Sequence, residues 1–247
     1  TINSMCGMRN LPLGLKLKGL KMPLDSVYAT TTHEGYLFTG TSEKTWYWHV
    51  PSLLCSEQIQ RVIEICTEET LSPGLVTSEG TITDFRKSLV TMNGYEELYE
   101  MVRGPMQEVN SLSGWNFDIT AIEEVQYTVY NGANNDQYSW HLDSMENDHL
   151  IDKGSDNIQN GTIRKISCSI PLDSSEDYDG GNFEFMVGIP TAESLGLEFR
   201  TSHISPPKFR EKGSAIFFPS FTFHQVTPVT KGTRRSLVVW FRGPKWR

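Results

Sequence analysis

The hydrophobic and polar positions divide the chain into a helical region followed by a region of short strands. From Ser56 onward, apolar side chains recur at the i, i+3, i+4 and i+7 spacing of one buried helix face. These side chains are Ile59, Val62, Ile63 and Cys66. Ser56 is the expected N-cap, with Glu57 in the first turn. The sequence TLSPGL that follows predicts the end of this helix.

A second helix is predicted to begin at Asn93. Glu96 stands three residues after Asn93, as in a capping box. The apolar pattern then runs through Leu98 towards Val109. Gly104-Pro105 interrupts this run, and it predicts a kink or a split because proline lacks a backbone N–H.

Beyond Trp115 the chain consists of short runs rich in aromatic and β-branched residues, separated by Gly, Asn, Asp and Pro. The seven runs read IEEVQYTVY, YSWHLD, RKISCSIPL, GNFEFMV, GSAIFFP, FHQVTPV and RRSLVVWF. The helices precede these strands and do not alternate with them, which disfavours a parallel βαβ sheet. The pattern therefore predicts a mainly β protein with flanking helices (α+β), with a sandwich, jelly roll or barrel as its core.

The same pattern sets the expected domain boundaries. Residues 1–45 have no sustained periodicity and predict an irregular arm, with a short strand near Tyr36–Phe38. Residues 46–247 are expected to form a single domain, with helical support at about 52–112 and a β core at about 115–243. The polar insertion at 144–163 predicts a surface loop.

Charge and cysteine content narrow the function classes. The 247-residue chain has a net charge of −8, which argues against nucleic acid as the partner. It contains no apolar run of about 18 residues, so no membrane span is expected, and its first residues lack a signal-peptide profile. The four cysteines form no CxxC pair, which predicts reduced, packed thiols and a cytoplasmic location.

The stretch YSWHLDS contains the first candidate chemistry. His141 and Asp143 lie on one face if the stretch is extended, but such a pair alone is more often a structural hydrogen bond than a metal site. His224 offers a second imidazole. Two imidazoles and one carboxylate form the facial triad that holds non-haem Fe(II) and leaves three positions open. A chelating 2-oxo acid fills two such positions, and O2 fills the third.

The strand after His224 supplies a candidate anchor for such an acid. The distal carboxylate of 2-oxoglutarate needs a cation, and the planar fork of arginine suits it. In an extended strand Arg234, Ser236, Val238 and Trp240 share one face, whereas Arg235 points the other way. The remaining histidines, His33, His49, His149 and His203, lie outside this arrangement, and of these only His203 is a candidate for substrate contact.

Together these segments closely resemble the Fe(II)/2-oxoglutarate-dependent dioxygenases of the prolyl 4-hydroxylase superfamily. The family motif is His-x-Asp, a distant His, and a basic residue about ten positions later followed by x-Ser. His141, Asp143, His224, Arg234 and Ser236 fill these positions, and the resemblance covers roughly residues 115–243. It implies a double-stranded β-helix (jelly-roll, cupin-like) core with N-terminal helices packed outside. It also implies Fe(II), 2-oxoglutarate and O2, with ascorbate as the reductant.

The resemblance also assigns roles to nearby aromatic and basic residues. Tyr130 matches the tyrosine whose hydroxyl reaches the oxo acid, and Tyr138 is a pocket-lining candidate; the alternative for both is plain core packing. In a regular strand Tyr138 and Trp140 face away from the metal. Arg86, in TDFRKS, is a candidate for the substrate rim or else lies in a solvated turn. Trp240 either lines the pocket or packs.

The implied activity is hydroxylation of an unactivated C–H bond, with succinate and CO2 as co-products. Asp143 favours this over halogenation, because related halogenases carry a small residue at that position. A prolyl residue in a peptide or protein is the leading substrate, and the 144–163 insertion is a candidate lid. The alternatives are an oxygenase of a free amino acid or small metabolite and a non-catalytic jelly-roll binding module. A nucleic-acid demethylase is disfavoured by charge.

Overall fold

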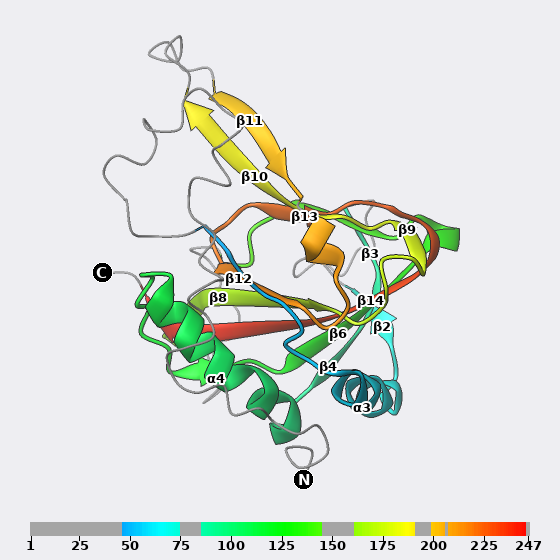
Figure 1. Ribbon diagram of the computed structural model, residues 1–247, viewed down its shortest axis with the longest axis horizontal. Helices are drawn as coiled ribbons and strands as arrows, with labels where there is room; N and C mark the ends of the chain where they lie inside the picture. Colours follow the sequence, from blue (N-terminus) through cyan, green and yellow to red (C-terminus); the bar gives the residue numbers. More distant parts are fainter. Residues whose placement is uncertain (1–45, 75–84, 145–160, 191–198, 206, 246–247) are drawn as a thin grey trace.

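A computed structural model describes residues 46–74, 85–144, 161–190, 199–205 and 207–245. Within these ranges the protein is mostly β, with two α-helices and antiparallel strand pairing (Figure 1). The helices are α3 (Ser56–Thr67) and α4 (Glu96–Leu112), with 3-10 turns η2 (Gly132–Asn134) and η4 (Pro207–Arg210). The strands are β1 (Trp48–Val50), β2 (Ser72–Pro73), β3 (Arg86–Lys87), β4 (Leu89–Asn93), β5 (Ala121–Ile122), β6 (Val125–Asn131), β7 (Gln137–His141), β8 (Thr162–Pro171), β9 (Tyr178–Gly180), β10 (Phe183–Pro190), β11 (Phe199–Ile204), β12 (Ala215–Pro219), β13 (His224–Val226) and β14 (Val229–Pro244).

The described strands form two sheets that pack against each other. The larger sheet has nine strands in the order β1-β12-β8-β14-β6-β4-β2, with β5 and β9 also paired to β14. The smaller sheet has five, in the order β11-β10-β13-β7-β3. An aromatic cluster joins Tyr130 and Phe218 of the larger sheet to Phe183 and Phe185 of the smaller one. This is the predicted jelly-roll arrangement of two antiparallel sheets around an inner layer.

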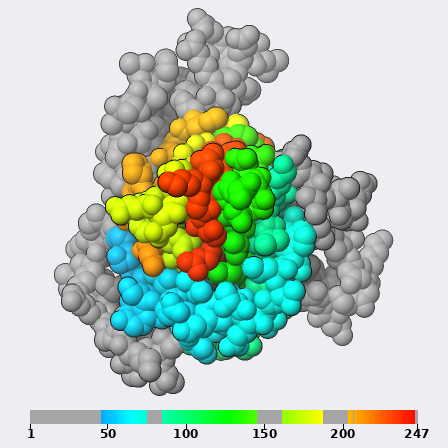
Figure 2. Space-filling model, turned by 90° about the vertical axis from the view of Figure 1, so that its right-hand side faces the viewer, coloured from blue at the N-terminus to red at the C-terminus, as the bar shows by residue number. Residues whose placement is uncertain are grey.

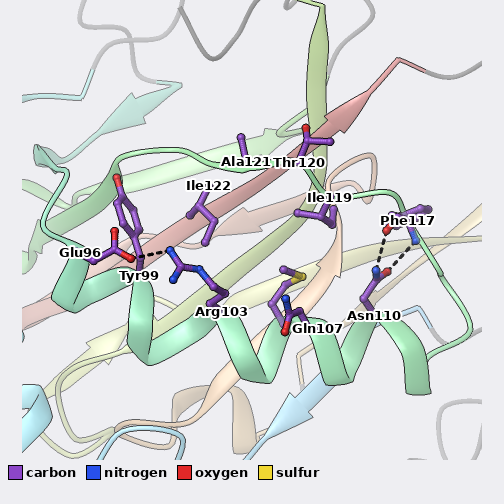
Figure 3. A pocket seen from close by; sticks show the side chains of 11 residues that line it. Glu96, Tyr99, Arg103, Gln107, Asn110, Phe117, Ile119, Thr120, Ala121 and Ile122 are labelled. Atoms are coloured by element: carbon purple, nitrogen blue, oxygen red, sulfur yellow. Dashed lines mark hydrogen bonds and ion pairs between the residues drawn. The ribbon is translucent and has the colours of Figure 1, made fainter. Parts of the chain in front are cut away.

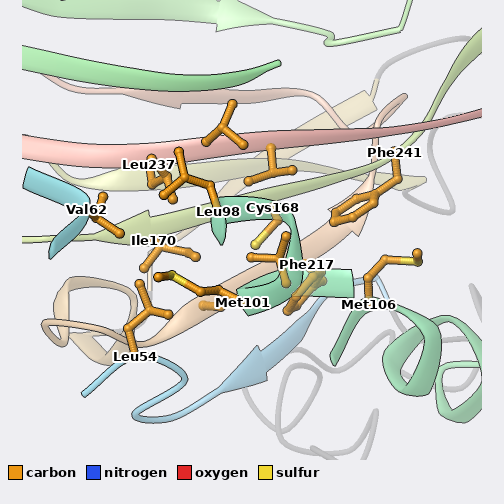
Figure 4. Close-up of a cluster of buried hydrophobic side chains, with 14 of the residues drawn as sticks. Leu54, Val62, Leu98, Met101, Met106, Cys168, Ile170, Phe217, Leu237 and Phe241 are labelled. Atoms are coloured by element: carbon orange, nitrogen blue, oxygen red, sulfur yellow. The ribbon is translucent and has the colours of Figure 1, made fainter. Parts of the chain in front are cut away.

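The helices cover the outer face of the larger sheet (Figures 1 and 4). The core between them buries Val62, Leu98 and Met101 from the helices against Leu237 and Phe241 of β14. Because side chains alternate across a strand, the intervening residues of β14 face the other sheet. One face of β14 therefore stabilises the fold, and the opposite face is available for a site.

Three glycines hold the beginning of β14 in place. A Cβ on Gly132 would lie 2.5 Å from the backbone nitrogen of Lys231. Gly180 and Gly181 adopt φ +72° and +61°, which only glycine populates at little cost. Figure 2 shows the start of β14 lying between the β6–β7 connection and the β9 region. Gly180 and Gly181 thus allow the β9 region to approach the backbone of β14 closely.

The seven predicted strands are confirmed, and the differences lie in the shorter elements. Helix α3 begins at Ser56 with Cys55 as its N-cap, and Ile65 is buried in its core-facing stripe where Ile63 is only partly buried. The strands β1, β2, β3, β4, β5, β9 and β11 were not predicted. Of these, β2, β3 and β5 have only two residues each, which is too few to show alternation.

The second helix begins three residues later than predicted. Asn93 belongs to strand β4, and its side chain accepts a hydrogen bond from the Tyr95 backbone N–H at 3.1 Å. Asn93 therefore caps the turn before the helix and not the helix itself. The helix also continues without a break through Pro105, so the expected split is wrong. Leu98 and Met106, buried on either side of Pro105, hold both halves on the sheet, and tertiary packing overrides local propensity.

Two further predictions, on the cysteines and on the 144–163 insertion, need correction. Other predictions concern residues that the structure does not describe. Cys66 and Cys168 are free and buried, as predicted. Cys55 is disulfide-bonded, so the prediction of reduced thiols is wrong at this position. Thr162 and Ile163 belong to β8 and not to a loop. The arm at 1–45 and most of the 144–163 insertion fall outside the described residues. In the described part of the chain, no helix is long and apolar enough to cross a membrane.

Replacing Phe217 with alanine should lower the free energy of unfolding by about 3–5 kcal/mol. Phe217 is fully buried between α4 and the larger sheet, and the truncation leaves a cavity that rigid neighbours cannot fill. Urea denaturation would measure the change. Leu112→Ala is the matched control, because Leu112 is 45% exposed and its loss should change stability by only about 0.5 kcal/mol. Equal effects of the two substitutions would contradict this view of the core.

Candidate metal centre and anion pocket

His141, Asp143 and His224 lie together between the two sheets. His141 ends β7 and His224 begins β13, and the two residues are direct partners in the strand pairing. Asp143 follows β7, and its backbone N–H donates to the Ser220 carbonyl at 3.0 Å. One donor atom from each of the three side chains lies within 4.8 Å of the others. The structure thus brings together the three ligands that the sequence predicts.

The hydrogen bonds of the two imidazoles leave both Nε2 atoms, which lie near the Asp143 carboxylate, free to bind a metal. His141 Nδ1 lies 2.7 Å from the Ser139 carbonyl, and His224 Nδ1 lies 2.9 Å from the Thr222 carbonyl. A carbonyl can only accept, so each Nδ1 carries the proton and each Nε2 presents a lone pair. The Nε2 atoms lie 3.6 and 3.5 Å from the Asp143 carboxylate oxygens. Backbone carbonyls orient metal-binding histidines in this way.

The electrostatics favour the ligand forms of these side chains. Burial opposes the ionisation of Asp143, but His224, His141 and Arg164 outweigh it and hold the pKa of Asp143 well below its ordinary value. Burial lowers the pKa of His224 to about 4. At neutral pH the site therefore offers a carboxylate and a neutral imidazole, the forms that bind a metal. Two nitrogens and one oxygen donor on one side of an ion fit Fe(II) and leave positions open.

A β-bulge places Tyr138 beside the metal-ligand candidates. In the β7–β13 pairing, His141 lies opposite His224 and Tyr138 lies opposite Val226, so three steps along β7 match two along β13. The bulge turns Tyr138 to the same side as His141, and the two ring centroids are 3.5 Å apart. The prediction that Tyr138 faces away from the metal is wrong for this reason. Trp140 does lie apart from these ligands, stacked with Phe223 at 6.0 Å.

Arg234 and Ser236 line the same pocket as His141, Asp143 and His224. The pocket also includes Trp240, as predicted from the alternation along β14, and Tyr130 of β6, the tyrosine that the resemblance singles out. Arg234 Nη1 donates to Ser236 Oγ at 3.2 Å. The Nε–H of Arg234 is buried and has no hydrogen-bond partner among the described residues. A buried guanidinium with an unpaired donor fits an anionic ligand.

Arg235 and Tyr130 also behave as the strand pattern indicates. Arg235 points away from the pocket and pairs with Asp173. Tyr130 is fully buried, and this burial raises its pKa, so the hydroxyl stays protonated and can donate. The ring of Tyr130 lies 5.3 Å from the Arg234 guanidinium carbon. The candidate anchor Arg234 thus lies close to an aromatic hydroxyl donor.

Arg86 lies behind the pocket wall. It is 8% exposed, so the alternative of a solvated turn is wrong. Its Nη2 donates to Gln126 Oε1 at 3.2 Å, and its guanidinium carbon lies 4.5 Å from the Tyr138 ring centroid. It is not among the residues that line the pocket. Contact of Arg86 with a substrate remains a prediction.

Several pocket residues were not singled out from the sequence. These are Gln126, Ser169, Phe183, Phe218 and Val226. Gln126 lies four residues before Tyr130 on β6, so strand alternation could have identified it. Phe183 and Phe218 belong to other strands, and only the folded structure shows that they meet.

The other described histidines lie elsewhere. His49 is buried on β1, where burial lowers its pKa to about 4. His203 is exposed on β11, with its ring 4.8 Å from Trp140. His33 and His149 fall outside the described residues. A second cavity of about 460 Å³ lies between α4 and residues 117–122 (Figure 3). It contains none of the predicted site residues.

Comparisons with known proteins agree with this geometry. A model of the 2OG-Fe(II) oxygenase superfamily matches residues 125–242. The PKHD-type hydroxylase YbiX of Escherichia coli O6:K15:H31 (strain 536 / UPEC) is 24% identical over 199 residues, 79% of this chain and 77% of the relative. The protein of the same name from Shigella dysenteriae serotype 1 (strain Sd197) is 24% identical over 197 residues, with the same coverage.

Solved structures share the fold at low sequence identity. A Pseudomonas putida prolyl-4-hydroxylase has a TM-score of 0.55 and 16% identity, covering 81% of this chain and 94% of that one. A Trichoplax adhaerens prolyl hydroxylase, in complex with a hypoxia inducible factor peptide fragment, has a TM-score of 0.56 and 16% identity. That match covers 79% of this chain and 83% of the other. The match to the family model over residues 125–242, the shared fold and the His-Asp-His cluster inside the matched residues make this chain similar to the 2OG-Fe(II) oxygenase superfamily.

Proposed function

We propose that the protein hydroxylates a prolyl residue in a peptide or protein, using Fe(II), 2-oxoglutarate and O2. The observation that supports this most directly is the pairing of a three-donor cluster with a buried arginine in one pocket. The named prolyl hydroxylases among the structural neighbours support the choice of substrate. The proposal treats residues 46–247 as one oxygenase domain, because β1 at its start pairs with β12 near its end.

In this proposal each residue has a defined part. His141, Asp143 and His224 hold Fe(II). Arg234 and Ser236 bind the distal carboxylate of 2-oxoglutarate, and Tyr130 donates its hydroxyl to the same cosubstrate. When bound, Fe(II) and 2-oxoglutarate activate O2, with one oxygen atom entering the substrate and the other entering succinate as CO2 is lost.

The pocket walls restrict water around the reacting groups. Phe183, Phe218 and Val226 are buried aromatic or aliphatic side chains on the pocket surface. A dry wall protects a strong oxidant from side reactions with solvent. Apolar walls with a few convergent polar groups are typical of cosubstrate sites.

Mass spectrometry of proline-containing peptides is the direct test. After incubation with Fe(II), ascorbate and 2-oxoglutarate, a product peptide should gain one oxygen atom, about 16 Da, with an equal yield of succinate. A peptide with alanine in place of proline should gain nothing. A gain on free proline or other amino acids alone would favour a metabolite oxygenase. Tight metal binding without any succinate would favour the non-catalytic binding module.

A further inference from the structure

A buried ion cluster lies beside the pocket. The Glu123 side chain is 5% exposed and lies between β5 and β6. It accepts hydrogen bonds from Arg164 Nε at 2.9 Å and Nη2 at 2.7 Å. Arg242 Nη1 donates to the same carboxylate, and Arg242 Nη2 donates to the Thr162 carbonyl at 2.7 Å. One carboxylate therefore joins the beginning of β8 to the end of β14.

Arg164 extends from this cluster to the metal site. Its Nη1 lies 3.4 Å from the backbone carbonyl oxygen of Asp143. Its guanidinium carbon lies 3.7 Å from the ring centroid of Trp240, a side chain that lines the pocket. The Glu123 backbone N–H donates to the Trp240 carbonyl at 2.9 Å. Arg164 thus touches both a metal ligand and the pocket wall while Glu123 holds it from the other side.

Burying a carboxylate with two guanidinium groups is a poor way to gain stability, because desolvation cancels much of the attraction. The two arginines also differ in their surroundings. Arg242 is buried, with side-chain exposure of 3%, whereas the Arg164 side chain is 25% exposed. Without the carboxylate, the long Arg164 side chain could turn towards solvent, because it would regain the conformational entropy that is lost when it is held in one rotamer. Glu123 keeps Arg164 over the indole.

We propose that Glu123 is a positioning residue that acts through Arg164 to fix the iron ligand Asp143 and the pocket wall at Trp240. This inference rests on the proposed function. Loss of a group that hydrogen-bonds to a metal-ligating residue typically reduces metal affinity or activity by about 10- to 100-fold. The same range is expected when the contact from Glu123 through Arg164 to Asp143 is broken.

The chain contains a matched control for this cluster. Arg235 of β14 and Asp173, two residues after the end of β8, form another arginine–carboxylate pair, with the Asp173 side chain 5% exposed. Neither residue lines the pocket. Asp173→Asn therefore removes a buried charge from the same sheet without disturbing the metal site.

The test is an anaerobic calorimetric titration of the metal-free protein with Fe(II). Glu123→Gln and Arg164→Met should each raise the Kd for Fe(II) by about 10- to 100-fold. Arg164→Lys should be intermediate, because it keeps the charge but loses the planar fork. Combining Glu123→Gln with Arg164→Met should add little to either single change, since both break one connection. Asp173→Asn should lower the melting temperature and leave this Kd unchanged.

A second readout separates positioning from stability. The ratio of 2-oxoglutarate consumed to product formed should rise in the Glu123 and Arg164 variants, and it should stay at the wild-type value in Asp173→Asn. If Glu123→Gln does not fold, the Arg164 variants decide the matter, because they leave Glu123 paired with Arg242.

Unchanged Fe(II) affinity in folded Arg164→Met, with normal binding by the wild type, would overturn the positioning role and leave the proposed function intact. Failure of the wild-type protein itself to bind Fe(II) would overturn the proposed function and this inference together.

Discussion

Asp143→Ala should abolish detectable hydroxylation and reduce Fe(II) affinity by at least about 100-fold, beyond the usual effect of losing a neighbouring hydrogen bond. The carboxylate is the one anionic donor in the three-residue cluster. Without it, two neutral imidazoles must hold a divalent cation alone. Succinate release measures the activity, and calorimetry measures the metal affinity.

Asp179→Ala is the matched control for this substitution. Asp179 is an exposed carboxylate on β9, so its removal should change neither quantity. Wild-type activity in Asp143→Ala would remove Asp143 from the ligand set. The variant should also remain folded, because an alanine needs no counter-charge in a buried position.

Arg234→Ala should raise the KM for 2-oxoglutarate far more than it weakens metal binding. Truncating one partner of a buried, hydrogen-bonded charge pair costs about 2–5 kcal/mol, which is roughly a 30- to 5,000-fold change in affinity. The Fe(II) affinity of the protein without 2-oxoglutarate should change little, because Arg234 is not one of the metal-ligand candidates. Succinate formation at varied 2-oxoglutarate concentration gives the KM.

Arg235→Ala separates the anchor from its neighbour in the sequence. Arg235 pairs with Asp173 on the other face of β14, so its loss should reduce stability and leave the KM near the wild-type value. A large rise in KM for Arg235→Ala with none for Arg234→Ala would contradict this assignment. The residue that binds 2-oxoglutarate would then be Arg235, on the opposite face of β14.

The sequence was most informative where residue spacing alone determines a side chain's direction. Arg234, Ser236 and Trp240 lie on one face of β14 because a regular strand alternates with a period of two. The fold class was also predictable, because runs of aromatic and β-branched residues separated by turn residues mark the longer strands.

The failures have physical causes. Tyr138 was misplaced because a bulge adds one residue to β7, and no local signal in YSWHLDS marks it. The start of the second helix was predicted at Asn93, too early in the sequence, because an asparagine that caps a turn resembles one that caps a helix. Glu123 was not noticed at all, since its partners Arg164 and Arg242 lie 41 and 119 residues away in the sequence.

The metal-ligand candidates and the arginine anchor belong to different sheets. His141 and His224 are on the five-stranded sheet, whereas Arg234 and Ser236 are on the nine-stranded one. Under the proposed function, a cosubstrate held by both groups ties the two halves of the sandwich to each other. At a concentration 100 times its Kd, a ligand adds about 2.7 kcal/mol to the stability of the folded state. The cellular concentrations of iron and 2-oxoglutarate would then affect the stability of the folded protein as well as its catalytic rate.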